Sequence, residues 1–234
     1  MTMSLGRECI PALKEAAPAV LPSLLLCDFG NLEREIELLE EAGVAGLHLD
    51  VMDGVFVPNF TYGMTIISAL RKLTDLPLDV HLMMVQPEKY IEAFRDAGAD
   101  IITVHAEATK DACGLMNQIK ELGVGAGIAV NPDTSVKVIE DAIPHADMAL
   151  VMSVHAGFGG QSFIEPVLDK FDEIRNMPGG DDLILEIDGG INLSTIGIAT
   201  ERGAQLLVAG SAIFKQDDYS VAMESMMAQV KYNQ

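Results

Sequence analysis

The sequence predicts an α/β fold, a single-domain TIM (β/α)8 barrel, and three observations carry this prediction. Eight short runs rich in Leu and β-branched residues alternate with eight longer segments of helical periodicity. Several of these segments end in glycine, as helices that return to a strand commonly do, at Gly43, Gly98, Gly123 and Gly203. The chain has 234 residues, of which 49% are hydrophobic, so it is large enough to bury such a barrel in one domain.

The strands and helices are expected in strict alternation. The expected strands cover residues 19–26, 45–51, 77–83, 100–105, 124–130, 146–153, 182–187 and 204–209. The expected helices cover residues 32–42, 64–73, 88–97, 113–122, 135–142, 166–177, 193–201 and 220–230. Alternation favours parallel strands with right-handed crossovers, and eight units favour a closed barrel. An open doubly wound sheet is the alternative, but the turn after the first strand reads CDFGNL rather than GxGxxG.

The N-terminal segment interrupts this pattern. Residues 1–18 contain Pro11 and Pro18, with a short helix expected at 12–17. We expect residues 1–18 to form an N-terminal extension outside the core, and residues 19–234 to form the barrel domain.

Composition excludes several classes of partner. A formal net charge of −20 disfavours binding to nucleic acid or to anionic membranes, so any phosphate site must be built from backbone N–H groups. No apolar run reaches about 18 residues, so we expect neither a membrane span nor a signal peptide, and a soluble, cytoplasmic protein. The three cysteines are widely spaced, which is typical of reduced thiols.

Polar side chains gather at the ends of the predicted strands. In the stretch 46–59, alternation places His48 and Asp50 on one face of a strand that leads into turn residues. A buried histidine beside a capping aspartate is the alternative interpretation of this stretch. In a barrel, however, all strand ends face one mouth, so their polar residues converge. Those ends carry Ser23, His48, Asp50, His81, His105, Glu107, Asn131, Ser153, His155, Glu186, Asp188 and Ser211.

Four of these residues form a candidate metal site. Two imidazoles and two carboxylates suit one divalent ion, Zn, Fe, Mn or Co, held by His48, Asp50, His81 and Asp188. An ion beside a carbonyl group stabilises the negative charge that develops when a neighbouring C–H proton is removed. Asp50 and Asp188 would then be the catalytic residues, one removing a proton from a carbon and the other returning it to the opposite face. The product of that exchange is an epimer.

Glycine-rich stretches follow the last three predicted strands, at 155–162, 188–190 and 209–211. Glycine lets backbone N–H groups approach an oxyanion, and the last loops of a barrel commonly hold phosphate. Three such loops favour a phosphate site over ordinary tight turns. No Lys lies at a strand end, which counts against an aldolase that works through a Schiff base.

Eight motifs together resemble those of the ribulose-phosphate 3-epimerase family, over about residues 20–214. They are PSLLLCDFGNL, HLDVMDGVFVPNF, DVHLMM, HAEA, NP at 131–132, MSVHAGFGGQSF, EIDGG and VAGSAIF. The resemblance implies an isomerase of the pentose phosphate pathway that interconverts D-ribulose 5-phosphate and D-xylulose 5-phosphate, with the metal ligands and acid/base pair named above. It also implies a pocket lined by Met52, Met83, Met152 and His155. The substrate contacts that it implies are Ser23, His81, Gly157, Phe158, Gly159, Gly160, Asp188, Gly189, Gly190, Gly210 and Ser211.

Two departures from the family pattern bear on substrate preference and rate. His155-Ala156 stand where the family usually has Asn-Pro, and Leu26-Cys27 replace its usual Ser-Ala. One alternative is a 3-epimerase of a ketohexose 6-phosphate such as allulose 6-phosphate. Another is a sugar-phosphate-binding barrel without turnover. In each case the expected partner is a small sugar phosphate, and we expect a homo-oligomer.

Overall fold

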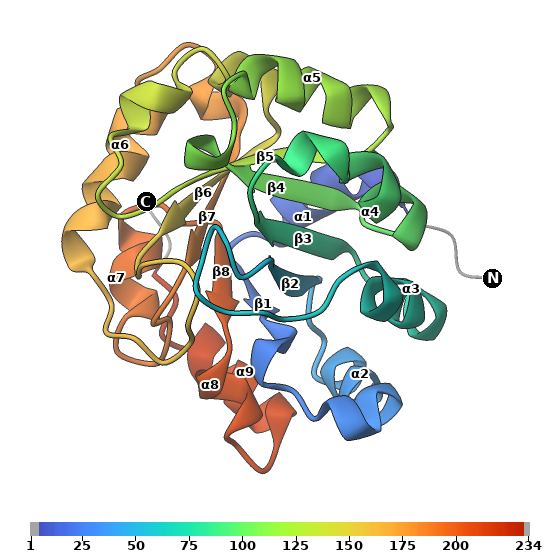
Figure 1. Cartoon of the computed structure of the whole chain (residues 1–234). Coiled ribbons are helices and arrows are strands. Elements are labelled where there is room, and N and C mark those ends of the chain that lie inside the picture. Colours follow the sequence, from blue (N-terminus) through green and yellow to red (C-terminus); the bar gives the residue numbers. More distant parts are fainter. Residues whose placement is uncertain (1–4, 232–234) are drawn as a thin grey trace.

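Eight parallel strands form a nearly closed barrel in the computed structural model, which describes residues 5–231 (Figure 1). The sheet order is β1-β8-β7-β6-β5-β4-β3-β2, and a parallel bridge between Ser23 and His48 brings the first strand back beside the second. The fold class predicted from the sequence is confirmed. The strands are β1 (Ala19–Pro22), β2 (Leu47–Met52), β3 (Leu78–Met83), β4 (Ile101–His105), β5 (Gly125–Val130), β6 (Met148–Met152), β7 (Ile184–Asp188) and β8 (Leu206–Ala209).

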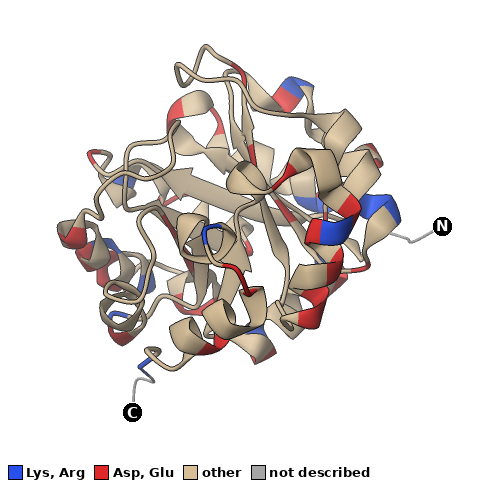
Figure 2. Ribbon diagram, turned by 90° about the horizontal axis from the view of Figure 1, so that it is seen from below, with Lys and Arg blue, Asp and Glu red and all other residues tan. Residues whose placement is uncertain are grey.

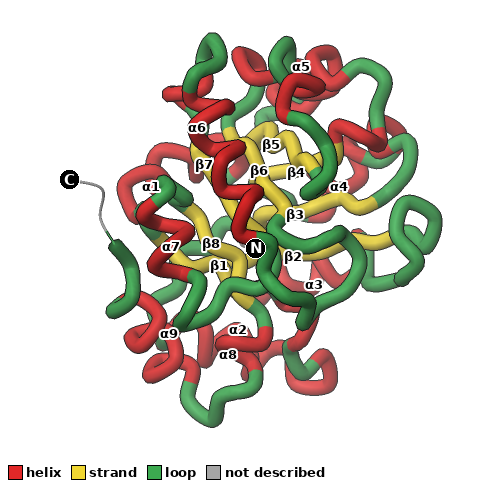
Figure 3. Tube along the Cα trace, turned by 90° about the vertical axis from the view of Figure 1, so that its left-hand side faces the viewer, coloured by secondary structure: helices red, strands yellow, loops and turns green. Residues whose placement is uncertain are grey.

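Helices surround these strands, as the red and yellow tubes of Figure 3 show. They are α1 (Cys9–Ala16), α2 (Leu32–Glu41), α3 (Met64–Leu73), α4 (Ile91–Ala97), α5 (Ala112–Glu121), α6 (Asp169–Arg175), α7 (Ile196–Glu201), α8 (Ser211–Phe214) and α9 (Tyr219–Met227). Short 3₁₀ turns connect several of them to the strands.

Two expected elements differ in the structure, and one observed helix was not expected. The first strand ends at Pro22, because the Ser23 side chain caps a 3₁₀ turn at Leu24–Leu26. No α-helix covers 135–142; the chain makes a 3₁₀ turn at Val136–Ile139, since only the two end residues of that turn are buried. The four-residue helix α8 was not expected, because one turn carries no helical periodicity.

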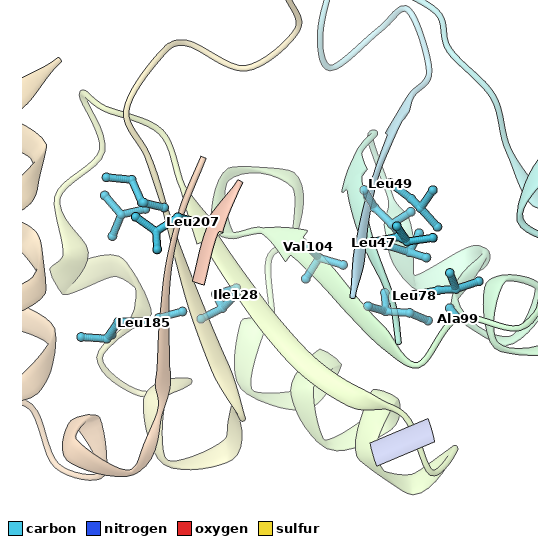
Figure 4. Close-up of a cluster of buried hydrophobic side chains, with 14 of the residues drawn as sticks. Leu47, Leu49, Leu78, Ala99, Val104, Ile128, Leu185 and Leu207 are labelled. Carbon is cyan, nitrogen blue, oxygen red and sulfur yellow. The ribbon is translucent and has the colours of Figure 1, made fainter. Parts of the chain in front are cut away.

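Most of the apolar core lies between the barrel and the helices. Alternate strand residues point outward, and in Figure 4 Leu47 and Leu49 of β2 lie beside Leu78 of β3. These leucines are fully buried and belong to one continuous cluster with the inner faces of the helices. The other face of each strand points into the barrel, so that face is free to carry polar side chains.

The expectation that residues 1–18 lie outside the core was wrong for helix α1. Cys9, Ile10 and Leu13 are buried against inward-facing residues at the N-terminal ends of the strands, among them Ile101 and Met148. Apolar residues recur there at i, i+1 and i+4, a helical stripe that the two prolines obscured. The helix therefore closes the bottom of the barrel, whereas residues 1–4 lie outside the described part.

Acidic residues outnumber basic residues in the molecule. The chain has 35 Asp and Glu but only 15 Lys and Arg, and Figure 2 shows the acidic residues spread over helices on several sides. No helix within residues 5–231 is long and apolar enough to cross a bilayer.

Candidate active site

Four ionisable side chains converge inside the barrel from strands β2, β3 and β7. One ligand atom from each of His48, Asp50, His81 and Asp188 lies within 4.8 Å of the others. Oδ1 of Asp50 is 3.1 Å from Nδ1 of His81 and 3.4 Å from Nε2 of His48. The structure thus brings together the four residues that the sequence singled out as metal ligands.

The donor atoms of this cluster fit a divalent metal ion. Nδ1 of His48 lies 2.6 Å from Oδ2 of Asp79, so this nitrogen carries the proton and donates it to the carboxylate. When the ring is neutral, as a metal ligand must be, Nε2 of His48 presents a lone pair, and within the described residues this nitrogen is buried without a hydrogen-bond partner. A buried imidazole nitrogen facing carboxylates in this way is suited to hold a metal.

The two catalytic candidates differ in their protonation. Burial, and next the charge of Asp50, raise the pKa of Asp188 to about 7. Burial alone would also raise the pKa of Asp50, but His48 and His81 lower it below its usual value. Near neutral pH, Asp50 is therefore ionised while Asp188 exchanges a proton, which is the division that acid/base chemistry requires.

Two hydroxyl groups orient Asp50. Oγ of Ser23 donates to Oδ2 of Asp50 at 2.6 Å, and both residues are buried. Oγ1 of Thr61 donates to the backbone carbonyl of Asp50 at 2.7 Å and accepts from the backbone N–H of Met52 at 2.9 Å. The loop after β2 thereby returns to hold the end of that strand.

A cavity of about 250 Å³ opens above Asp50 and Asp188. No Lys or Arg is among the residues described as lining it, so any anion there meets backbone N–H groups and hydroxyls. His48 and His81 lie below it and do not line it. The predicted site residues that do line it are Ser23, Asp50, Met52, Met83, Met152, His155, Gly157, Phe158, Gly159, Gly160, Asp188, Gly189, Gly190, Gly210 and Ser211.

Hydrogen bonds hold the glycine-rich loops in place. Oγ of Ser153 donates to the carbonyl of Gly189 at 2.6 Å, and Nδ2 of Asn59 donates to that of Gly157 at 2.9 Å. Gly189 has φ of 116°, and a Cβ at this position would lie 2.5 Å from the side chain of Val154. This position therefore requires glycine. The His155 side chain is 59% exposed at the rim.

The acidic residue beneath the site, Asp79, was not predicted from the sequence. Asp79 is fully buried and orients His48, and it lies two residues before His81 on the same face of β3. The alternation that identified His48 and Asp50 could have found it. Glu186, which was expected at the mouth, lies deeper, and burial together with Asp79 raises its pKa well above the usual value.

Comparison with known proteins identifies the family. The family model described as the ribulose-phosphate 3-epimerase family matches residues 19–214. The chain belongs to the ribulose-phosphate 3-epimerase family. It is 49% identical over 210 residues to ribulose-phosphate 3-epimerase of Bacillus subtilis, covering 88% of this chain and 97% of that protein. It is 48% identical over 208 residues to the Synechocystis protein of the same name, covering 87% and 90% of the two chains.

The fold recurs in solved structures of other enzymes. A 3-hexulose-6-phosphate synthase matches with a TM-score of 0.68 and 17% identity, over 91% of this chain and all of that one. KGPDC from Streptococcus mutans matches with a TM-score of 0.66 and 14% identity, over 91% and 97% of the chains. At these identities the likeness concerns the barrel alone. Membership of the epimerase family places the chain among carbohydrate isomerases, as the sequence predicted.

Proposed function

We propose that this protein is a metal-dependent ribulose-phosphate 3-epimerase that interconverts D-ribulose 5-phosphate and D-xylulose 5-phosphate. One observation carries the proposal: two carboxylates with opposed pKa shifts, Asp50 and Asp188, reach one cavity from β2 and β7, beside an imidazole nitrogen of His48 that has no hydrogen-bond partner in the described part of the chain. A site that only binds a sugar phosphate has no need of this arrangement.

The proposed metal ligands are His48, Asp50, His81 and Asp188, which would hold one Zn, Fe, Mn or Co ion. The bound ion would supply electrostatic stabilisation of the negative charge that develops on the C2 oxygen of the substrate.

The proton transfers are assigned to the two aspartates. One carboxylate takes the C3 proton, and the electron pair of the broken C–H bond forms the C2–C3 double bond of an enediolate. The other aspartate, protonated, returns a proton to the opposite face of C3, and the double bond collapses back to the ketone. In the reverse direction the two residues exchange roles. The hydrogen bond from Ser23 orients Asp50 for this step.

The walls of the cavity are assigned to substrate binding. Met52, Met83 and Met152 would keep water away from the enediolate. The loops at 157–160, 189–190 and 210–211 would hold the phosphate through backbone N–H groups and the hydroxyl of Ser211. A contact of His81 with substrate, a homo-oligomeric state and a cytoplasmic location remain predictions.

Solvent isotope exchange tests the proposal. The metal-loaded protein is incubated in D2O with D-ribulose 5-phosphate, and deuterium at C3 and formation of D-xylulose 5-phosphate are followed by NMR. We expect both, with allulose 6-phosphate turned over more slowly. Faster turnover of the hexose would favour the ketohexose alternative, and an absence of exchange with either substrate would favour the binding protein.

A further inference from the structure

A chain of buried hydrogen bonds leads away from His81 on the side opposite the metal cluster. Nε2 of His81 lies 2.9 Å from Nε2 of His105, and Nδ1 of His105 lies 3.2 Å from Oε2 of Glu107. Both imidazole rings are fully buried and stack with their centres 5.0 Å apart. Two facing ring nitrogens share one proton, so the donors along this series of hydrogen bonds all point the same way. That direction decides which nitrogen of His81 carries a proton.

Glu107 sets the direction. Its Oε1 accepts a hydrogen bond from the backbone N–H of Asn131 at 2.8 Å and another from the hydroxyl of Thr134. Lys170 fixes that turn, because its Nζ donates to the carbonyls of Asn131 at 2.7 Å and Thr134 at 2.8 Å. Although burial opposes it, hydrogen bonds from His105 and Thr134 lower the pKa of Glu107 to about 2. A carboxylate held in this way can only accept at Oε2.

His105 passes the direction on. The fully buried ring of His105 faces the Glu107 carboxylate with Nδ1 and the His81 imidazole with Nε2, and in its neutral form it has a single N–H. That proton is on Nδ1, donated to Glu107; the Asn131 amide also approaches Nδ1, but at 3.4 Å it is farther away than the charged acceptor. Nε2 of His105 then accepts, and Nε2 of His81 donates. Nδ1 of His81, which faces Asp50 at 3.1 Å and Asp188 at 4.0 Å, is then left to present its lone pair to a cation bound between this ring and the two carboxylates.

We propose that Glu107 and His105 are positioning residues that fix the tautomer of His81 and so prepare its Nδ1 as a metal ligand. The inference rests on the proposed metal site and adds two residues to it that touch neither metal nor substrate. His48 is oriented independently by Asp79, so each imidazole ligand has its own carboxylate.

The substitution Glu107→Gln reverses the direction of these hydrogen bonds. The Asn131 N–H can only donate, so the amide oxygen of the variant must stay on the Oε1 side and its NH2 group must face His105. Nδ1 of His105 then accepts, its proton moves to Nε2, and it donates to Nε2 of His81. The remaining proton of a neutral His81 is placed on Nδ1, where it blocks the metal.

Asp79→Asn is the matched control. It also replaces a buried carboxylate by an amide, and Asp79 contacts a proposed ligand directly, whereas Glu107 acts through His105. However, the second oxygen of Asp79 faces the Thr103 hydroxyl at 3.3 Å, and the Glu186 carboxyl group, kept neutral by burial, also interacts with Asp79; both groups can donate or accept. The amide of this variant can therefore keep its oxygen on His48 and preserve the tautomer. An effect of lost charge alone would be larger for Asp79→Asn, whereas an effect of the tautomer is larger for Glu107→Gln.

Two readouts test the inference. Zn²⁺ affinity is measured by competition with a chelator, and the protonation of the His81 nitrogens is measured by ¹⁵N NMR on Zn²⁺-loaded, histidine-labelled protein, with circular dichroism confirming the fold of each variant. We expect a proton on Nε2 of His81 in the wild type and none there in Glu107→Gln. We also expect Zn²⁺ affinity about 10- to 100-fold lower in Glu107→Gln and a smaller loss in Asp79→Asn.

The outcomes separate this inference from the proposed function. Unchanged Zn²⁺ affinity in Glu107→Gln, a retained proton on Nε2 of His81 in that variant, or a larger loss in Asp79→Asn would overturn the positioning role while leaving the epimerase intact. A wild type that binds no Zn²⁺, Fe²⁺, Mn²⁺ or Co²⁺ would overturn the metal site itself, and with it the role of Glu107 and His105 in preparing a metal ligand.

Discussion

Replacing Asp188 by asparagine should stabilise the metal-free protein while abolishing its turnover. Asp188 is largely buried beside the ionised Asp50, so its own ionisation is unfavourable without a bound cation. An amide of the same shape has no charge to bury. It cannot serve as an acid or base, and loss of such a group costs about 10²- to 10⁴-fold in rate. We therefore expect activity to fall by at least that factor, because the same change also removes a proposed metal ligand.

The size of the stability gain follows from the pKa. A rise from 3.8 in the unfolded chain to about 7 in the folded one corresponds to about 4 kcal/mol between the two protonation states. Below pH 4 both states hold the proton, so the carboxyl group carries no penalty. As the pH rises from 4 to 7 the unfolded chain ionises first, and the wild type loses stability until the folded group ionises too. The gain from Asp188→Asn should therefore be about 2 to 3 kcal/mol larger at pH 8 than at pH 5.

Urea denaturation of EDTA-treated wild type and variant at pH 5 and pH 8 measures this difference. Adding Zn²⁺ provides the control, because it should stabilise the wild type much more than the variant. If the two proteins differ by the same amount at both pH values, the site does not raise the pKa of Asp188, and the reasoning from buried like charges fails. Near-normal turnover in the variant would remove Asp188 from the mechanism.

Three further predictions concern the parts that hold the site. Leu13→Ala should lower the free energy of unfolding by about 2 to 5 kcal/mol, because it opens a cavity in the barrel floor. Glu15→Ala, on the exposed side of α1, is the control and should change this free energy by less than about 0.5 kcal/mol; both are measured by urea denaturation. Arg7→Ala should lower the free energy of unfolding by about 1 kcal/mol at pH 7 and by progressively less below pH 4. Although burial opposes it, the hydrogen bonds from Arg7 lower the pKa of Asp147, and this stabilisation is lost as Asp147 becomes protonated. Equal losses at pH 7 and pH 3 would contradict this prediction. Gly189→Ala should raise KM for D-ribulose 5-phosphate several-fold and lower stability by about 1 to 3 kcal/mol, because φ of 116° strains any other residue; unchanged steady-state kinetics would separate this loop from phosphate binding.

The barrel could be predicted from the eight strand-like runs that alternate with helical segments, and the cluster inside it from period-2 alternation within those strands. Once His48 and Asp50 are placed on one face of a strand, the same register applies to His81 and Asp188, and a closed barrel must bring them together. The burial depth of a residue does not follow from this pattern. Glu186 and Asp188 share a face of β7, yet the first is fully buried and the second lines the cavity.

The barrel floor could not be predicted for a different reason. Helix α1 is separated from its strands by long stretches of sequence, and its buried residues contact Ile101, Met148 and Ile184 from three different strands. Local pattern shows that Ile10 and Leu13 form an apolar stripe, but it does not show which surface that stripe covers. Only the closed barrel creates the open end that the stripe fills.

The polar residues of the interior form two layers, and this arrangement explains how an acidic protein can hold several carboxylates in its core. In the upper layer Asp50 and Asp188 line the cavity and His81 lies beneath it, while in the lower layer Asp79 binds His48 and Glu186 lies beside them. Burial keeps Glu186 neutral. Although burial opposes it, the charges of Asp79 and Asp50 raise the pKa of His48 well above its usual value, so in the metal-free protein a protonated His48 offsets the charge of Asp79 and the lower layer adds little net charge beneath the upper one. A cation bound in the upper layer would offset the charge that remains on Asp50 and Asp188. Asp188, whose ionisation destabilises the metal-free barrel, is therefore the carboxylate from which metal binding recovers the most free energy, which is why chelation should lower the stability of the wild type far more than that of Asp188→Asn.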